Sequence, residues 1–383
     1  MTHRAGDEFF EHKRLWSLRK DEILGCYLAA YLPKIMMLRK PVLIVDAFAG
    51  PGRFRDGEAG SPRIICRCVR ETQDKNLTAP QPVSVWCIER ITTLHSQLVS
   101  NIEEFEFAHA RNGAFGDFAS EIAAQTRTSS VFLYVDPFTV EGLVWSELNR
   151  IFAGLGEGNS VEILLNLNSP SFVRRGLALL KSKVTAIDDD ETPVDADNQV
   201  DATFDALDAV AGGRWWQELL TSSINYPAMV QEFVHEYCKR LSSRFSEVVS
   251  HAVKAKPHHQ VPKYHLVFGT RHLDGLTLMN DEMVKSRRKL ADIARDLKQP
   301  TLFETRSEEL VPDVDRLPAI ILELAKNQIK RKLLIAQVIK GNFCEFHRTE
   351  IRGSIESLLQ SKRLISETGK SRINDDVNVW TAN

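Results

Sequence analysis

The first half of the chain alternates between short apolar runs and stretches with helical periodicity. Strands are expected at 41–47, 83–88, 105–110, 131–135 and 161–166, most of them near-continuous apolar runs. Helices are expected at 14–38, 61–72, 92–102, 115–126 and 145–152, from the spacing of their apolar residues. Strands that alternate with helices form βαβ units. The pattern therefore predicts the α/β fold class, with a parallel sheet covered on both faces.

The alternation lapses after Asn168, and residues 186–208 form an acidic segment that we interpret as a surface insertion. The elements expected beyond it are a helix at 227–246, strands at 248–254 and 264–268 joined by a turn at 256–259, and a basic helix that ends near residue 299. These two strands must pair antiparallel, because a parallel crossover needs a dozen or more residues. A parallel sheet with its last strand inserted antiparallel is typical of class I methyltransferases.

Residues 313–383 follow a different pattern, and we assign them to a second domain after a first domain of residues 1–300. Helices are expected at 320–326, 333–339 and 349–359, and strands at 364–366 and 377–380. Three helices and a hairpin in this order predict a winged helix-turn-helix domain. Residues 300–316 contain two prolines and many acids, and we interpret them as the linker.

Composition is that of an ordinary globular protein, with 383 residues, 43% of them apolar and 26% charged. The net charge of −2 argues against a surface that is basic throughout, but it allows a local basic face. The six cysteines lack zinc-site spacing, so we expect buried free thiols and no metal. No apolar stretch approaches the ~20 residues that span a bilayer, and the N-terminus lacks a signal-peptide core. The expected location is the cytoplasm.

The loop that follows the first strand has the composition of a cofactor-binding loop. It consists of Asp46, Ala47, Phe48, Ala49, Gly50, Pro51 and Gly52. Small residues allow the backbone to approach a ligand at the carboxyl end of a parallel strand. The spacing is neither the dinucleotide fingerprint nor a P-loop. An acid at the strand end suits a cofactor that carries an ammonium group, so we predict S-adenosylmethionine. The alternative is a tight turn without a ligand.

Two further acids follow the second and third strands. Glu89 ends the second strand, where a carboxylate can accept both ribose hydroxyls of a nucleoside cofactor. Asp117 follows the third strand, where an acid can meet the exocyclic amine of adenine. Alternatively, Glu89 is a solvated acid at a helix N-terminus and Asp117 is a helix cap. Together with Asp46, they predict a pocket for S-adenosylmethionine.

The fourth strand ends in Asp136, Pro137 and Phe138, the residues that we expect to act on the acceptor. Amine-directed methyltransferases carry a similar Asp/Asn-Pro-Pro-Tyr/Phe segment at this point. Its acid and a backbone carbonyl accept hydrogen bonds from the target amine, and its aromatic ring stacks on a flipped base. Here only one proline is present, and the aromatic residue comes one place early. Asn166 and Asn168 could line the same pocket or satisfy buried backbone.

Basic residues are concentrated near the C-terminus. Between residues 316 and 372, twelve lysines and arginines stand against five acids. Arg348 and Arg352 on the last helix, with Lys370 and Arg372 in the following turn, could be a recognition helix and a wing that contact phosphates. The alternative is a protein-docking module, since winged helices also serve in that role.

Several segments together resemble the three-Cys-motif partner (TcmP) protein family over essentially the whole chain. They are Lys13–Trp16, Asp46–Phe54, Gly57–Pro62, Asp136–Phe138 and Tyr264–His272. The resemblance implies a class I methyltransferase-like domain, a C-terminal winged helix, a radical-SAM-like three-cysteine partner protein and a phage or mobile-element defence setting. The loop and the Asp-Pro segment also distantly resemble ribosomal-RNA adenine-N6 methyltransferases, although Thr139 stands where those enzymes have tyrosine.

We therefore predict a methyltransferase that uses S-adenosylmethionine and acts on an amine acceptor, most simply a nucleic-acid base. The alternative, from another functional class, is an inactive methyltransferase fold that serves as an adaptor or DNA-binding regulator.

Overall fold

The computed structural model describes residues 15–75, 82–156, 158–181, 202–222, 224–254, 259–296 and 313–382, without the side chains of 15–19 and 290–296. Four expected features fall wholly or largely outside these ranges: the first residue of the first helix, the acidic run at 188–191, the turn at 256–259 and the linker at 300–316. The chain divides into two compact units, Met1–Arg271 and His272–Asn383.

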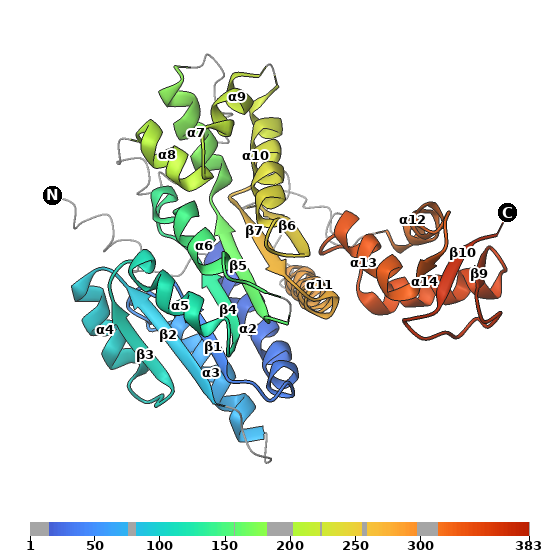
Figure 1. Ribbon diagram of the computed structural model, residues 1–383, viewed down its shortest axis with the longest axis horizontal. Coiled ribbons are helices and arrows are strands. Elements are labelled where there is room, and N and C mark those ends of the chain that lie inside the picture. Colours follow the sequence, from blue (N-terminus) through green and yellow to red (C-terminus); the bar gives the residue numbers. More distant parts are fainter. Residues whose placement is uncertain are drawn as a thin grey trace. The chain divides into compact units, whose positions relative to one another are not determined.

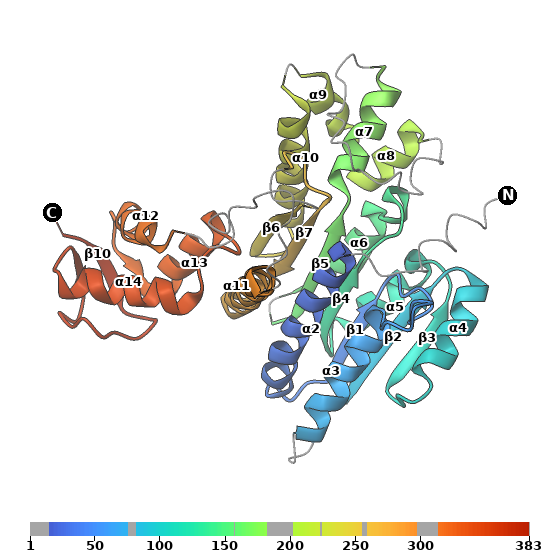
Figure 2. The ribbon, with the colours of Figure 1, turned by 180° about the vertical axis from the view of Figure 1, so that it is seen from behind.

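The first unit contains a single large sheet with helices on both faces. Its strands are β1 (Val42–Asp46), β2 (Val83–Glu89), β3 (Ala108–Asn112), β4 (Ser130–Val135), β5 (Val161–Leu167), β6 (Glu247–Val253) and β7 (Tyr264–Thr270). Its α-helices are α2 (Leu15–Met36), α3 (Ser61–Lys75), α4 (Thr92–Ile102), α5 (Ala119–Gln125), α6 (Trp145–Phe152), α7 (Ser169–Leu179), α8 (Phe204–Ala211), α9 (Trp215–Thr221) and α10 (Tyr226–Leu241). Figure 1 shows α5 and α6 on one face, and Figure 2 shows α2 and α3 on the other.

The seven strands are arranged in the order β3-β2-β1-β4-β5-β7-β6. The strands β1 to β5 pair in parallel, as predicted. β7 is antiparallel to both of its neighbours, β5 and β6. The expected antiparallel insertion of the last strand is therefore confirmed. β1, β4 and β5 are buried along their whole length, because helices cover both faces of the sheet at its centre.

The third strand begins later than predicted. It was expected at 105–110, but it covers Ala108–Asn112. Phe105 lies in a turn, where its N–H donates to the carbonyl of Ile102 and its own carbonyl accepts from Ala108. β3 is an edge strand of the sheet and has no buried residue, so its polar sequence carries no apolar run. The two phenylalanines that suggested a strand instead pack on each other, with ring centroids 5.9 Å apart.

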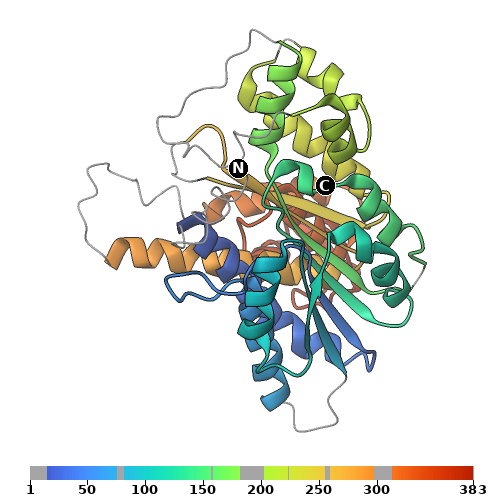
Figure 3. The same cartoon turned by 90° about the vertical axis from the view of Figure 1, so that its left-hand side faces the viewer.

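Helices occupy part of the region in which the sequence pattern lapsed. α7, α8 and α9 were not predicted, and α8 begins inside the supposed insertion at 186–208. They form a helical layer with α10, seen in green to yellow in Figure 3. The core of this layer is aromatic: Phe172 stacks on Phe233 at 4.1 Å and meets Trp216 edge-on at 5.6 Å. α8 and α9 have eight and seven residues, so few apolar repeats fall within each of them.

The second unit contains α11 (Leu273–Asp296), α12 (Leu317–Leu324), α13 (Arg331–Gly341), α14 (Arg348–Gln360) and strands β8 (Ile329–Lys330), β9 (Leu364–Ser366) and β10 (Asn378–Thr381). Three short helices and two strands thus lie within a few residues of the expected positions, and β8 is an addition. The small antiparallel sheet has the order β8-β10-β9. α11 belongs to this unit, whereas the sequence pattern placed it at the end of the first domain.

In the parts of the chain that the structure describes, no helix combines the length and the apolar character needed to cross a membrane.

Candidate functional site

The carboxyl ends of the parallel strands gather the predicted site residues at one edge of the sheet. Asp46 is the last residue of β1 and pairs in register with Cys87 of β2 and Tyr134 of β4. Asp136 directly follows β4, and Asn166 lies near the end of the neighbouring β5. Because the strands are parallel and adjacent, residues up to 120 positions apart converge here.

Asp46 presents a buried carboxyl oxygen without a partner. The residue has no exposed surface, and its Oδ1 accepts the N–H of Phe48 at 3.4 Å. Its Oδ2 has no hydrogen bond of standard geometry among the described residues, and the Ser61 hydroxyl lies only near enough to the carboxyl to affect its pKa. Burial raises the pKa of Asp46 to about 7, although the hydroxyl of Ser61 and the amide of Phe48 partly offset this effect. A bound cation would supply the missing partner and favour the ionised carboxylate.

The loop from Ala47 to Gly52 is tied to the rest of the sheet edge. Gly50 and Gly52 have φ values of 58° and 78°, which favour glycine. The N–H of Gly50 donates to Oε2 of Glu89 at 2.9 Å, and Asn101 donates to the carbonyl of Pro51 at 2.8 Å. Ala47 and Ala49 are buried, and the half-buried Phe48 ring lies 6.1 Å from that of Phe115. These contacts therefore hold the backbone of the loop in one conformation.

Glu89 is buried, so it is not the solvated acid that we considered as the alternative. Its Oε2 accepts from Gly50, and its Oε1 accepts the N–H of Ile91 at 2.7 Å. Burial raises the pKa of Glu89, and the two backbone amides oppose that change. The carboxylate is thus held in one orientation, and each oxygen keeps a second lone pair for a ligand hydroxyl.

Asp117 acts as a cap, as the alternative for this residue stated. Its Oδ2 accepts the N–H of Ala114 at 2.8 Å, at the start of the short 3-10 helix Phe115–Phe118. One carboxyl oxygen is therefore committed to local structure.

Asp136 is the centre of a polar cluster that includes a lysine. Lys20 Nζ lies 2.6 Å from Oδ2, and the Tyr134 hydroxyl donates to the same oxygen at 3.3 Å. Asn166 donates to Oδ1 at 2.6 Å, and its own Oδ1 is buried without a partner in the described structure. The Lys20 ammonium also lies 5.5 Å from the ring centroid of Tyr264. Asp136 therefore already binds one amine.

Sequence reasoning missed Lys20, which lies 116 positions before Asp136. A signal was nevertheless present. Lys20 precedes Ile23, Leu24 and Tyr27 at helical spacing, on the apolar face of the first predicted helix. A lysine on a face that becomes buried requires an acidic partner.

The remaining residues near this edge have separate roles. Pro137 follows Asp136, and the Phe138 side chain is 40% exposed beside it. Asn168 caps α7 by accepting the N–H of Ser171. His265 is a core residue: it is buried, its Nδ1 lies 2.7 Å from the Ser169 hydroxyl, and burial lowers its pKa to about 4.

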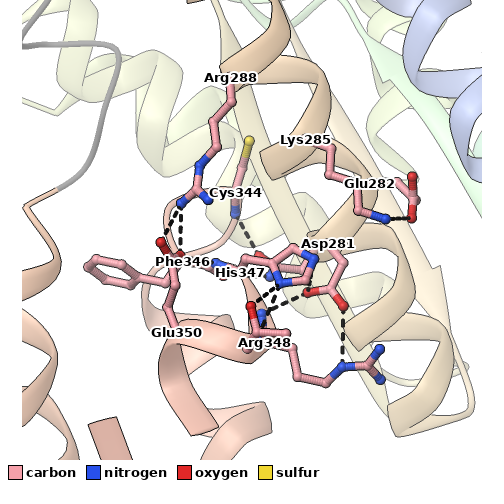
Figure 4. Close-up of polar contacts among 11 residues, drawn as sticks. Asp281, Glu282, Lys285, Arg288, Cys344, Phe346, His347, Arg348 and Glu350 are labelled. Atoms are coloured by element: carbon pink, nitrogen blue, oxygen red, sulfur yellow. Dashed lines mark hydrogen bonds and ion pairs between the residues drawn. The ribbon is translucent and has the colours of Figure 1, made fainter. Parts of the chain in front are cut away.

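The two arginines proposed for nucleic-acid contact on the last helix are ion-paired. Figure 4 shows Arg348 beside the buried Asp281 of α11, which accepts its backbone N–H at 2.9 Å and lies 3.3 Å from its Nε. Arg352 lies 2.6 Å from Asp375, which also binds Arg331. The turn residues Lys370 and Arg372 are exposed. Of the four predicted residues, Arg348 and Arg352 are therefore paired with acids, whereas Lys370 and Arg372 are exposed.

Further hydrogen bonds join α11 to α14 and to the segment before it. Both carboxyl oxygens of Glu350 accept from Arg288 at 2.8 Å (Figure 4). Asn280 donates to the carbonyl of Phe346 at 2.8 Å and accepts the N–H of Cys344 at 2.9 Å. These contacts are the physical reason that α11 belongs to the second unit.

Comparisons with known proteins leave the site to be interpreted from its own geometry. No family model matches the chain, and no curated protein matches it. Among solved structures, one that matches is described as "a putative caffeoyl-CoA O-methyltransferase from Staphylococcus aureus". It is 10% identical, with a TM-score of 0.29, and the match covers 63% of this chain and 82% of that one. Similarity at this level is too low to support a conclusion about function.

Proposed function

We propose that the unit Met1–Arg271 has the class I methyltransferase fold and binds S-adenosylmethionine. The order β3-β2-β1-β4-β5-β7-β6, with β7 antiparallel between β5 and β6, supports this fold. The observation that carries the cofactor proposal is the unpartnered, buried Oδ2 of Asp46 at the end of β1. An acceptor atom in that position calls for a hydrogen-bond donor, which the ammonium group of the cofactor would supply.

The other residues of the edge fit the same ligand. Glu89 would accept the ribose hydroxyls, because its carboxylate is buried and already fixed by Gly50 and Ile91. The backbone of Gly50 to Gly52 would allow the cofactor to lie close to the loop. When bound, S-adenosylmethionine supplies an electrophilic methyl group on a sulfonium. The protein's part is to hold an acceptor in line with that methyl group.

We propose that the acceptor is an amine held by Asp136, with Phe138 beside it. The contact between Lys20 and Asp136 supports this reading, because it places an amine at that carboxylate. The 40% exposed ring of Phe138 offers a face on which a base can stack. The acceptor class that we favour is a nucleic-acid base. It is supported by the excess of twelve lysines and arginines over five acids between residues 316 and 372, in a region that we interpret as a winged helix.

One observation favours a second function, that of a cofactor-binding regulator without methyl transfer. Lys20, Tyr134 and Asn166 together occupy both oxygens of Asp136. An acceptor amine would have to displace the lysine from a 2.6 Å ion pair. If that exchange does not occur, the fold binds the cofactor and transfers nothing.

The proposed three-cysteine partner protein rests on the sequence resemblance. Co-expression of the two chains, with affinity capture of either one, tests it directly. We expect the partner to be retained. Failure to retain it would leave the cofactor proposal standing and remove the partner.

Calorimetric titration of the full-length protein with S-adenosylmethionine tests the cofactor proposal. We expect binding by the native protein and an affinity at least about tenfold lower for Asp46→Ala, which removes a charged hydrogen-bond acceptor. Glu236→Ala, a change at a surface acid of α10, is the matched control and should bind normally. No binding by the native protein, or equal binding by Asp46→Ala, would refute the proposal. Normal binding without transfer of a labelled methyl group to DNA, RNA or the partner would establish the regulator.

A further inference from the structure

We propose that the second unit contacts nucleic-acid phosphates through the β9 edge of its small sheet, and not through the first turns of α14. This inference rests on the proposed nucleic-acid acceptor. We define the basic β9 surface as Lys362, Arg363, Lys370 and Arg372. All four residues are exposed, and they flank the three residues of β9.

The basic β9 surface follows the free edge of a sheet. β9 is the last strand in the order β8-β10-β9, so only one of its sides is paired (Figure 1). Lys362 and Arg363 lie between α14 and β9, and Lys370 and Arg372 lie in the connection to β10. Cations therefore lie at both ends of the strand, and Ile365 between them is 39% exposed.

Charge compensation distinguishes this surface from most of the second unit, where the exposed Lys330 of β8 is another cation without an ion pair in the described residues. Cations paired with acids elsewhere in the unit are Lys285, Arg288, Arg316, Lys326, Arg331, Lys332, Arg348 and Arg352. No residue of the basic β9 surface has an ion pair within the described structure. Glu367 is the nearby acid, and its Oε2 accepts from the Asn378 side chain at 2.9 Å. An excess of positive charge therefore remains at this edge.

The exposed side of α14 lacks such an excess. Its exposed residues are Thr349, Gly353, Ser357 and Gln360, all of them uncharged. Arg352 is half-buried and, with Arg331, holds Asp375. Arg331 and Arg352 thus hold the β9–β10 connection through Asp375. The charges that remain available for phosphates are on that connection and on Lys362 and Arg363.

The connection is held in one conformation. The Ser366 hydroxyl donates to the carbonyl of Lys370 at 2.6 Å, and the N–H of Gly369 donates to the carbonyl of Ser366 at 2.9 Å. At its other end, the N–H of Lys332 donates to the carbonyl of Asp375 at 2.9 Å. Because the backbone is already ordered, phosphate binding would cost little additional entropy there.

An acidic peptide added as a strand is less well suited to this edge, because β9 has only three residues to pair with it.

Fluorescence anisotropy with a labelled 20-base-pair DNA duplex, repeated over a series of salt concentrations, tests the inference on the full-length protein. Each phosphate contact contributes about 0.9 to the slope of log affinity against log salt. We therefore expect the double variant Lys370→Gln/Arg372→Gln to reduce the magnitude of this slope by about 1.8. The double variant Lys362→Gln/Arg363→Gln should reduce it by the same amount. Lys239→Gln/Lys326→Gln, which changes two exposed lysines elsewhere, is the matched control and should leave it unchanged.

The possible outcomes are distinct. A slope reduced only by Arg348→Gln/Arg352→Gln would overturn the inference and place the contact on α14. Binding of poly-glutamate with no binding of duplex DNA or of a single-stranded RNA of the same sequence would overturn it in favour of a protein partner. Loss of nucleic-acid binding does not affect the titration with S-adenosylmethionine, so failure of this inference and failure of the cofactor proposal can be told apart.

Discussion

The ammonium of Lys20 lies 2.6 Å from the Asp136 carboxylate, and both side chains are mostly shielded from solvent, with 10% and 22% exposed. The pair joins α2 to the end of β4. Because Lys20 holds Asp136, this ion pair links the packing of α2 to the availability of Asp136 for a ligand.

Replacing Lys20 with methionine should destabilise the protein by about 2 kcal/mol. The carboxylate would lose its counter-ion but keep Tyr134 and Asn166 as donors, so the cost should fall below the 3–5 kcal/mol typical of a fully buried pair. Urea unfolding measures the change. Adding Asp136→Asn to Lys20→Met should cost less than the sum of the single changes, and strict additivity would show that the pair contributes nothing.

Affinity for S-adenosylmethionine should rise as pH increases through 7. Burial raises the pKa of Asp46 to about 7, so the residue is protonated below that pH and cannot bind an ammonium group as an anion. Below pH 7 the affinity should fall by up to about tenfold per pH unit. Calorimetry between pH 5.5 and 8.5 measures this dependence, and Asp46→Asn should flatten it. A native profile that is already flat would contradict the assignment.

The buried Glu162 should make the first unit less stable as pH rises from about 4.5 through 7. Burial raises the pKa of Glu162 to about 7, although the hydroxyls of Tyr27 and Thr270 partly oppose it. The native state then holds a proton that the unfolded state releases, so deprotonation favours unfolding across that window. Glu162→Gln should therefore gain stability relative to the native protein between pH 5 and pH 8. If the denaturant midpoints of Glu162→Gln and of the native protein differ by the same amount at pH 5 and at pH 8, burial does not raise the pKa of this carboxyl.

Asp281→Ala should loosen the N-terminus of α14. Asp281 has 3% of its side chain exposed and binds both the backbone and the guanidinium of Arg348. Its removal should cost about 2–4 kcal/mol, because a partly buried guanidinium and an N–H lose their acceptor. Hydrogen exchange of Arg348 to Glu350 should accelerate strongly. Asp315→Ala, at an exposed acid in the same unit, is the control and should leave exchange unchanged.

The sequence predicted the sheet better than the helical layer next to it. β1, β4 and β5 are buried on both faces, so each is a continuous apolar run that stands out in the sequence. β3 is an exposed edge strand with a polar sequence, and its start was misplaced. α7 was not predicted from the spacing of its apolar residues, although Asn168 and Pro170 at its start are a capping signal.

At the site, the sequence placed acids at strand ends, and tertiary structure decided what each of them contacts. Asp46 and Glu89 were expected at the sheet edge because parallel strands end there together. That Glu89 binds Gly50, that Asp117 caps a turn and that Asp136 binds Lys20 could not be predicted from spacing.

The sequence by itself therefore determined the α/β sheet, its loop of small residues and the order of its acids, because burial and turn geometry act over neighbouring residues. The tertiary structure alone decided which charged side chains are paired with an opposite charge and which remain exposed. The partners of Asp136 and Asp281 include residues 116 and 67 positions away, and no local pattern records such pairs. The same long-range pairing removed Arg348 and Arg352 from the exposed positive charge and left it on Lys370 and Arg372.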